Sequence, residues 1–427
     1  MENDLNNFQK AREEEKRMER TVENCPFRTK FHIMPPVGWL NDPNGLCQFR
    51  GVYHAYFQYS PLNVNGGGGY WGHCTSRDLL HWEYKEPVLT TDIPEDKSGV
   101  YSGSALIEDG RMYLFYTGNV KKPGSYDYID SGRISTQILV ESDDGQHMSE
   151  KVKLLGMEDY PEDITQHVRD PKVWKGDGHY YMVLGVRSRA WDENGKRRDK
   201  GGLLIYQSGH SLPGRSQDPE ETFREWDMGF DFYAPQSFQA DDGRRILIGW
   251  AGMPDTTETH RNLSVANGWQ HCLTLPCELE YHDGKIFRMP VREIYDLDWE
   301  EAPVENGRFH WGGGKALKLD MGGICGERTV IRIGNRENGV TVTVEGNRVE
   351  LSFLDEKGVT SRCGGGRGKR IGRMEGPVEE LLVLIDSSIM EIFVNGGETV
   401  FTTRLYLEAE ERVIDVSGYD GYVLEMI

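Results

Sequence analysis

The sequence predicts an all-β protein in two parts, a β-propeller followed by a β-sandwich. The chain has 427 residues, which is long enough for two folded units. Its 51 glycines and 18 prolines separate short runs that are rich in Val, Ile, Tyr and Phe, and such runs are typical of strands. One segment plan also recurs four times along the first part of the chain.

The repeated segment has a polar motif, about eight further residues, a turn with glycine and then an aromatic or aliphatic strand. The turn glycines are separated by 59, 68 and 65 residues, a period that fits four-stranded propeller blades. Equivalent positions in successive blades face one central axis, so we expect the polar motifs to surround a single funnel-shaped pocket. The motifs and their glycines are Asp42 with Gly51, Ser102 with Gly110, Asp170 with Gly178, and Pro235 with Gly243.

The segments before and within the repeats have their own signals. Residues 1–25 are charged and predict a peripheral helix. Its candidate anchors are Phe8, Met18 and Val22. Residues 26–296 hold the repeats and form the predicted propeller domain. The Asp-Gly pairs that begin at Asp109, Asp177 and Asp242 fit type I′ hairpin turns.

The pattern changes after residue 290. PVREIYDLDWEE predicts a short helix or linker. From residue 305 to 427 the polar motifs stop, while strand patterns such as VEELLVLID and SSIMEIFVN continue between turns. This region predicts an antiparallel β-sandwich.

The composition disfavours several classes of partner. The net charge is −20, and no cluster of Lys and Arg alternates with aromatic residues, so we expect no nucleic-acid partner. No run approaches the ~18 apolar residues that a membrane span needs, and the first residues lack the apolar region of a signal peptide. We therefore expect a cytoplasmic protein with no membrane partner. Its oligomeric state does not follow from the sequence.

No cofactor or metal site is predicted. GGGGYWG at 66–72 satisfies the spacing of a dinucleotide fingerprint, but it lies in a glycine-rich loop rather than between a strand and a helix. CGGGRGKR lacks the first glycine and the final Ser or Thr of a phosphate loop, and no HExxH run occurs. The seven cysteines are scattered without a CxxC pair, which favours reduced thiols over disulfides or zinc.

Two Asp-Pro motifs carry the candidate chemistry. WLNDPNG places Asp42 between an indole, two carboxamides and a Pro-Asn-Gly turn, and RDPK places Asp170 at the equivalent point of its segment, beside Arg169. Glycoside hydrolysis needs a pair of carboxyl groups, one as proton donor and one as nucleophile or base. The alternative is that both motifs only cap strands as turns.

Aromatic and neutral polar residues near these motifs fit a carbohydrate pocket, because aromatic faces bind sugar rings and amides or hydroxyls bind sugar hydroxyls. Each of these residues alone is as compatible with a structural role. The candidates for substrate binding are Trp39, Leu40, Asn41, Gln58, Trp71, Tyr101, Ser102 and Arg169, with Tyr233, Gln236 and Trp250 in the same class.

Six motifs in order give the chain a resemblance to glycoside hydrolase family 32, the invertase and sucrose-6-phosphate hydrolase family. They are WLNDPNG at 39–45, FQYSP at 57–61, WGH at 71–73, YSGS at 101–104, RDP at 169–171 and DFYAPQSF at 231–238. SSIMEIFVNGGETVFTTRLY also resembles the sandwich domain of the family. The resemblance extends from about residue 26 to the C-terminus.

The resemblance implies a five-bladed propeller and a sandwich that together hydrolyse terminal β-D-fructofuranosides, such as sucrose or sucrose 6-phosphate, with retention of configuration. Asp42 matches the nucleophile, and Asp170 matches the residue that stabilises the transition state. The sugar-binding positions of the family match Trp39, Asn41, Gln58, Trp71, Ser102 and Arg169. No cofactor is implied.

The general acid of the family, a Glu in a Glu-Cys-Pro-Asp motif, has no match in the sequence. The region where it belongs contains Glu193, Glu220, Glu221 and Glu225, none in that setting. Cys277-Glu278 mimics part of the motif but follows DFYAPQSF, in a segment that the family uses structurally. The 65 residues between the third and fourth turn glycines hold one blade step, so the sequence predicts an incomplete propeller that lacks one blade segment.

Two functions therefore stay open. The chain is a β-fructofuranosidase, with full or impaired activity, or a non-catalytic propeller that binds fructosides. A related five-bladed family that acts on arabinosides or xylosides fits less well, because the NDPNG form and the C-terminal sandwich disfavour it.

Overall fold

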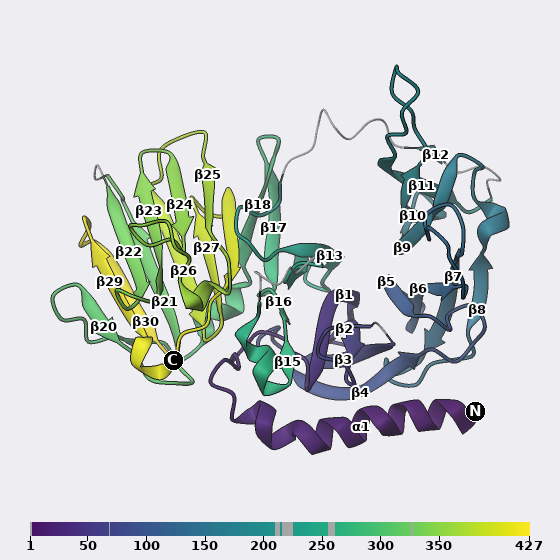
Figure 1. The fold of residues 1–427 in the computed structure, drawn as a ribbon, viewed down its shortest axis with the longest axis horizontal. Coiled ribbons are helices and arrows are strands. Elements are labelled where there is room, and N and C mark those ends of the chain that lie inside the picture. Colours follow the sequence, from purple (N-terminus) through teal and green to yellow (C-terminus); the bar gives the residue numbers. More distant parts are fainter. Residues whose placement is uncertain (1, 68, 210–213, 216–224, 255–260, 326–327) are drawn as a thin grey trace. The chain divides into compact units, whose positions relative to one another are not determined.

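A computed structural model describes residues 2–67, 69–209, 214–215, 225–254, 261–325 and 328–427 (Figure 1). The chain divides into two compact units. The first comprises Met1–Glu14, Asp42–Arg77 and Glu83–Arg224, and the second comprises Glu15–Asn41, Asp78–Trp82 and Glu225–Ile427. These units do not coincide with the expected domains at 26–296 and 305–427, whose boundaries stay a prediction.

The charged N-terminal segment forms a helix, α1 (Glu2–Glu23), as its composition predicts. The ring of Phe8 lies 6.3 Å from that of Tyr70, and the Tyr70 hydroxyl donates to the Asn7 carbonyl oxygen at 3.0 Å. Val22 is buried near the other end of the helix. Apolar residues at both ends of the helix therefore help to hold it.

Three antiparallel sheets make up most of the first unit, each with the strand order of a propeller blade (Figure 1). The first contains β1 (Gly38–Phe49), β2 (Val52–Ser60), β3 (Tyr70–Ser76) and β4 (Glu83–Thr90). The second contains β5 (Val100–Glu108), β6 (Arg111–Lys121), β7 (Arg133–Ser142) and β8 (Val152–Leu155), with η1 (Met157–Asp159) after it. The third contains β9 (Ile164–Gly176), β10 (His179–Ser188), β11 (Lys200–Gln207) and β12 (Gly214–Arg215). Buried side chains of the first two sheets form one hydrophobic core.

Two of the three predicted type I′ turns are confirmed. Asp109 and Gly110 have φ values of 49° and 73°, and Asp177 and Gly178 have 49° and 77°, so both residues of each pair adopt the left-handed conformation that this turn requires. The prediction for Asp242 is wrong, because only Gly243 has a positive φ there. The Asp242 carboxylate instead accepts the Arg244 backbone N–H at 3.1 Å, which stabilises a longer turn.

The third sheet is apolar on both faces. One face carries Leu184 and Leu204, which are fully buried. The other face carries Trp174 and Leu203, which are 39% and 45% exposed. Trp174 stacks on Tyr181 from the neighbouring strand, with ring centroids 5.4 Å apart. A sheet with two apolar faces is typical of a layer that is covered on both sides.

The second unit contains a fourth sheet of the propeller type, so the described residues form four such sheets. It contains β13 (Tyr233–Gln239), β14 (Arg245–Ala251), β16 (Cys272–Leu273), β17 (Cys277–His282) and β18 (Lys285–Pro290). Two short elements, η3 (Leu263–Asn267) and β15 (Trp269–Gln270), precede β16. β15 runs parallel to the start of β1, with Trp39 opposite Gln270.

The rest of the second unit forms a β-sandwich of two six-stranded sheets within the described residues. The first sheet has the order β19 (Glu300–Glu301), β30 (Tyr422–Met426), β21 (Ala316–Gly322), β26 (Glu380–Asp386), β27 (Ile389–Val394) and β28 (Thr399–Arg404). The second has the order β20 (Arg308–His310), β29 (Val413–Ser417), β22 (Thr329–Gly334), β23 (Gly339–Glu345), β24 (Arg348–Ser352) and β25 (Lys369–Arg373). Short helices η4 (Arg292–Asp296), η5 (Arg362–Gly364) and η6 (Ala409–Glu411) lie in its connections. One hydrophobic core fills the space between the sheets.

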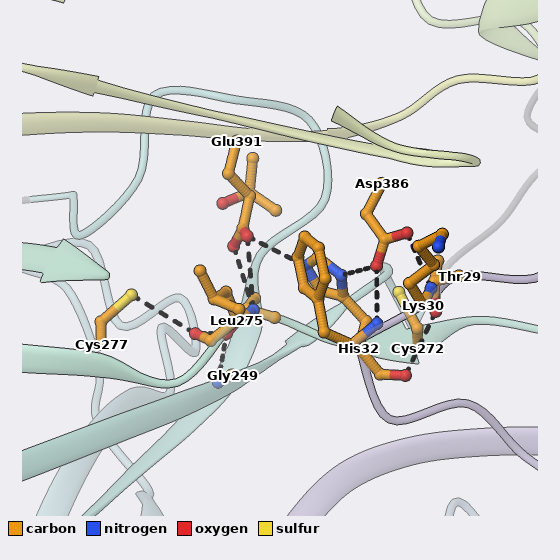
Figure 2. Close-up of polar contacts among 12 residues, drawn as sticks. Thr29, Lys30, His32, Gly249, Cys272, Leu275, Cys277, Asp386 and Glu391 are labelled. Carbon is orange, nitrogen blue, oxygen red and sulfur yellow. Dashed lines mark hydrogen bonds and ion pairs between the residues drawn. The ribbon is translucent and has the colours of Figure 1, made fainter. Parts of the chain in front are cut away.

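A buried ionic cluster joins the segment before β1 to this sandwich (Figure 2). His32 lies between two carboxylates, with Nδ1 2.7 Å from Asp386 and Nε2 3.0 Å from Glu391. Asp386 also accepts the backbone N–H groups of Lys30 and Phe31. Burial alone would lower the pKa of His32, but hydrogen bonds and charge from the two carboxylates raise this pKa to about 9. The imidazole is therefore charged at neutral pH, which balances part of the buried negative charge.

Candidate active site

Asp42 lies in β1 and is held by the second sheet of the first unit. The Ser102 hydroxyl donates to Asp42 Oδ2 at 2.5 Å. Two residues further on, the buried Asn44 accepts the backbone N–H of Gly103 at 3.2 Å. Gly45 has a φ of 52°, and a Cβ there would lie 2.6 Å from the Tyr56 ring. The NDPNG and YSGS motifs thus hold each other, and the orientation of Asp42 depends on both.

Asp170 lies in β9 in a conformation that is unusual for a residue with a side chain. Its φ is 61°, and its backbone N–H donates to the Thr117 hydroxyl at 3.1 Å. The next carbonyl, that of Pro171, accepts the Ser104 hydroxyl at 2.8 Å. Left-handed backbone at an aspartate costs about 1 kcal/mol and is often found at functional sites. The second sheet therefore fixes the RDP motif as well as the NDPNG motif.

The charge of Asp42 influences Asp170 electrostatically. Enclosure by protein atoms and the negative charge of Asp42 raise the pKa of Asp170 to about 7, although the neighbouring Arg169 lowers it. Arg169 Nε lies 3.4 Å from Asp170 Oδ2, and the Asp170 side chain is still 44% exposed. The Asp170 carboxyl group is therefore enclosed by protein atoms on some sides and open to water on others.

The structure places two further predicted binding residues of the first unit, Gln58 and Trp71, as supports. Gln58 is buried and donates to the Val100 carbonyl oxygen at 2.8 Å. Trp71 has no exposed surface, and its indole N–H donates to the Tyr101 carbonyl oxygen at 3.1 Å. Both residues therefore position the segment that leads to Ser102. The predicted contact between Trp71 and a sugar finds no support here, because a fully buried ring offers no face to a ligand.

In the second unit, Trp39 belongs to a cluster of aromatic rings, and the neighbouring Leu40 is fully buried. The Trp39 indole N–H donates to the Asn41 side-chain oxygen at 2.7 Å, so these two predicted residues are linked. The ring of His271 lies 4.3 Å from that of Trp39 and 5.0 Å from that of Trp250, nearly perpendicular to both.

The remaining acidic candidates do not have the surroundings of a proton donor. Burial alone would raise the pKa of Glu278, but hydrogen bonds from Arg292 and Arg244 lower it to about 2, so this carboxylate is ionised. Glu193 is exposed in a turn, and Glu225 is about half exposed and lies 3.6 Å from Arg370. Glu220 and Glu221 lie outside the described residues.

The described part of the chain contains no group of three or more His, Cys, Asp and Glu residues arranged to hold a metal ion. It also contains no helix that is long and apolar enough to cross a membrane.

Four propeller-type sheets, a β-sandwich and paired aspartates in NDPNG and RDP motifs define the class of the protein as a propeller-and-sandwich glycosidase. Comparison with family profiles agrees. The profile described as "Glycosyl hydrolases family 32 N-terminal domain" matches residues 32–210 and 194–290. The profile described as "Glycosyl hydrolases family 32 C terminal" matches residues 340–421. The chain belongs to glycosyl hydrolases family 32, and the predicted all-β fold is confirmed.

Its relatives are similar along nearly the whole chain. It is 32% identical to "Sucrose-6-phosphate hydrolase" of Bacillus subtilis (strain 168), over 93% of this chain and 92% of that protein. It is 33% identical to the protein of the same name from Klebsiella pneumoniae, over 88% of each. A mutant of the Bombyx mori GH32 β-fructofuranosidase in complex with sucrose has a TM-score of 0.74 at 25% identity, covering 98% of this chain and 97% of that one.

The relatives are longer within the aligned region. The alignment with the B. subtilis protein has 460 positions, whereas 93% of this 427-residue chain is about 397 residues. The difference means that about 63 positions of the relative have no counterpart in this chain. That number is close to one step of the repeat.

Proposed function

We propose that this protein binds the fructosyl group of sucrose or sucrose 6-phosphate and transfers it to Asp42, with retention of configuration. The observation that carries this proposal is the hydrogen bond from Ser102 to Asp42, together with the electrostatic influence of Asp42 on Asp170. The names of the relatives support the choice of substrates, since two of them are sucrose-6-phosphate hydrolases.

The chemistry follows from the two aspartates. The ionised Asp42 attacks the anomeric carbon of the fructosyl group, the bond to the leaving oxygen breaks, and a fructosyl ester forms on Asp42. Ser102 donates to Oδ2 and thereby orients the attacking carboxylate. Ionised Asp170 accepts hydrogen bonds from sugar hydroxyls. Water then cleaves the ester and releases fructose.

The departing glucosyl oxygen needs a proton, and Glu193, Glu225 and Glu278 do not have the surroundings of a proton donor. Three observations support the loss of one blade segment. The sequence has no Glu-Cys-Pro-Asp run, the sheet face with Trp174 and Leu203 is exposed, and about 63 aligned positions of the B. subtilis protein have no counterpart in this chain. We therefore propose that attack by Asp42 is retained and that protonation of the leaving group is impaired. The second candidate function, binding of fructosides without turnover, is favoured by the same observations.

A cytoplasmic location is also a proposal. It is supported by the free state of all seven cysteines, because disulfides are rare in the cytosol.

Parallel assays with sucrose and sucrose 6-phosphate test the substrate, and calorimetry with fructose tests binding alone. Because Asp42 acts on the anomeric carbon, Asp42→Asn should abolish turnover and leave fructose binding within about threefold of the wild type. Calorimetry that detects no fructoside binding would contradict both candidate functions.

A further inference from the structure

Asp170 lies in a β-bulge of the third sheet. The ladder between β9 and β10 shifts there, so that two residues of β9, Asp170 and Pro171, lie opposite Leu184 alone. A bulge interrupts the regular ladder and can redirect a side chain, and bulges are common beside active sites. Asp170 adopts a left-handed backbone in this bulge, and its N–H donates to the Thr117 hydroxyl of the second sheet. The bulged residue therefore has its hydrogen-bond acceptor in another sheet of the same unit.

The Thr117 hydroxyl belongs to a buried chain of hydrogen bonds within the first unit. Because the backbone N–H of Asp170 can only donate, the Thr117 oxygen accepts, and its own hydrogen is free to donate. Gln137 lies directly opposite Thr117 on the neighbouring strand, and its side-chain oxygen accepts this hydrogen at 2.7 Å. Neither Thr117 nor Gln137 has any exposed surface. Bulk water therefore cannot replace either partner.

The other end of the Gln137 amide holds the same segment of β9. Its nitrogen donates to the Tyr160 hydroxyl at 3.0 Å and to the Val168 carbonyl oxygen at 3.4 Å. A carbonyl oxygen only accepts, so the nitrogen of the amide, and not its oxygen, must face Val168. The amide thus holds β9 directly at Val168 and, through the Thr117 hydroxyl, at Asp170.

We propose that Gln137 is a positioning residue for the fructosyl transfer and acts on Asp170 through a relay formed by its own amide and the Thr117 hydroxyl. This inference rests on the proposed function and adds two residues of the second sheet to it. A left-handed backbone is unfavourable at an aspartate, so the bulge depends on contacts that hold it. The alternative is that the buried amide only stabilises the packing of the two sheets. Measurements on Asp170 itself separate these two roles.

Three substitutions test the relay. Thr117→Val keeps the shape of the side chain but removes the acceptor of the Asp170 N–H, whereas the conservative Thr117→Ser keeps the hydroxyl. Gln137→Met keeps the length of the side chain and removes the amide. The matched control is Ser142→Ala, because Ser142 is also buried in the second sheet and its hydroxyl accepts the Gly145 backbone N–H at 2.8 Å. This control loses a comparable hydrogen bond that is not part of the relay.

The ¹³C signal of the Asp170 carboxyl group, followed from pH 4 to 9, is the first readout and needs no substrate. Enclosure by protein atoms and the charge of Asp42 raise the pKa of this group to about 7. If the bulge relaxes, the carboxyl group gains contact with water and its pKa falls. We expect a pKa of about 6 or lower in Thr117→Val and Gln137→Met, and the wild-type value in Thr117→Ser and Ser142→Ala. Loss of sheet packing alone would lower the unfolding temperature without moving this pKa.

Hydrolysis of fructosyl fluoride is the second readout. We expect kcat/KM to fall about 10- to 100-fold in Thr117→Val and Gln137→Met and to stay within about threefold of the wild type in Thr117→Ser and Ser142→Ala, because even a remote change that misplaces a reacting group is costly. Thermal unfolding reports whether each variant is folded, and Gln137→Met decides the question if Thr117→Val is not.

The outcomes are distinct. A folded Gln137→Met variant with the wild-type titration of Asp170, or with the wild-type kcat/KM, would overturn the relay and leave the proposed function intact. If the wild type neither binds nor cleaves a fructoside, the proposed function fails, and the part of Gln137 in the reaction fails with it.

Discussion

Ser102 donates its hydroxyl hydrogen to Asp42 Oδ2 over 2.5 Å, between residues that are 60 positions apart in the sequence. A hydrogen bond to a charged group contributes about 1.5–3 kcal/mol. In the proposed mechanism, this bond orients the carboxylate that attacks the anomeric carbon.

We expect Ser102→Ala to lower kcat/KM about 10- to 100-fold, because Asp42 loses its orienting donor while the fold is kept. The matched control is Ser149→Ala, whose hydroxyl contacts only backbone groups at the surface of the same sheet. Hydrolysis of fructosyl fluoride measures the effect. Equal rates for the Ser102 variant and the wild type would show that Asp42 is oriented by other contacts.

The titration of Asp170 should respond to its two neighbours in opposite directions. The pKa of Asp170 is raised to about 7. Asp42→Asn removes a negative charge and should lower this pKa, whereas Arg169→Gln removes a positive charge and should raise it. The ¹³C signal of the Asp170 carboxyl group, followed from pH 4 to 9, reports both shifts. Identical titration curves in the three proteins would mean that the two aspartates are not coupled.

The buried cluster of His32, Asp386 and Glu391 should make stability depend on pH on the alkaline side. The folded protein keeps the proton of His32 up to its pKa of about 9, while the unfolded chain releases it near 6.5. The free energy of unfolding should therefore be unaffected by this group below pH 6.5 and should fall by about 3 kcal/mol as the pH rises to about 9.

Urea unfolding at a series of pH values measures this loss. His32→Gln should be destabilised by about 3–5 kcal/mol at pH 6, because two buried carboxylates lose their positive partner. In this variant the free energy of unfolding should also no longer fall between pH 6.5 and 9. The exposed His310→Gln serves as the control and should keep the slope. A slope of equal size in the His32 variant would assign the pH dependence to other groups.

Thiol labelling should find one reactive cysteine in the folded protein. Cys325 is exposed, whereas the other six cysteines are buried. Burial raises the pKa of Cys47, Cys272 and Cys363 to about 12, so their thiolate fractions are very small. A thiol reagent should modify one group in the native protein and seven after denaturation. Cys325→Ser should abolish the native reaction, and rapid modification of a second thiol would show local opening of a core.

Local signals in the sequence predict elements better than they predict contacts. Asp109-Gly110 forms the expected turn because its chemistry is local, whereas Asp242 does not, because its carboxylate binds the Arg244 backbone instead. The sequence around Trp71 fits a sugar site as well as a hydrophobic core. Only the structure, in which Trp71 is fully buried, assigns this residue to the core.

Several buried contacts join residues that lie far apart in the sequence. Arg367 donates to the Asn262 side-chain oxygen across 105 positions. His32 pairs with Asp386 across 354 positions. Such pairs leave no periodic signal. The repeat places Asp42 and Asp170 at equivalent points of two segments, and the effect of the Asp42 charge on Asp170 agrees with that placement.

We expect the protein to retain attack by Asp42 while protonation of the leaving group is impaired. Sucrose leaves as a poor alkoxide and needs the proton, whereas fluoride does not. General acid catalysis typically contributes ~10²–10⁴-fold. Initial fluoride release from fructosyl fluoride, measured against glucose release from sucrose, is therefore the most direct test, with intact-mass detection of a fructosyl adduct. We expect fluoride release to be at least about 100-fold faster, the adduct to form on Asp42, and both to vanish in Asp42→Ala. Sucrose hydrolysis at ordinary enzymatic rates would contradict the account, because another carboxyl group, such as Glu193 or Glu225, would then supply the proton.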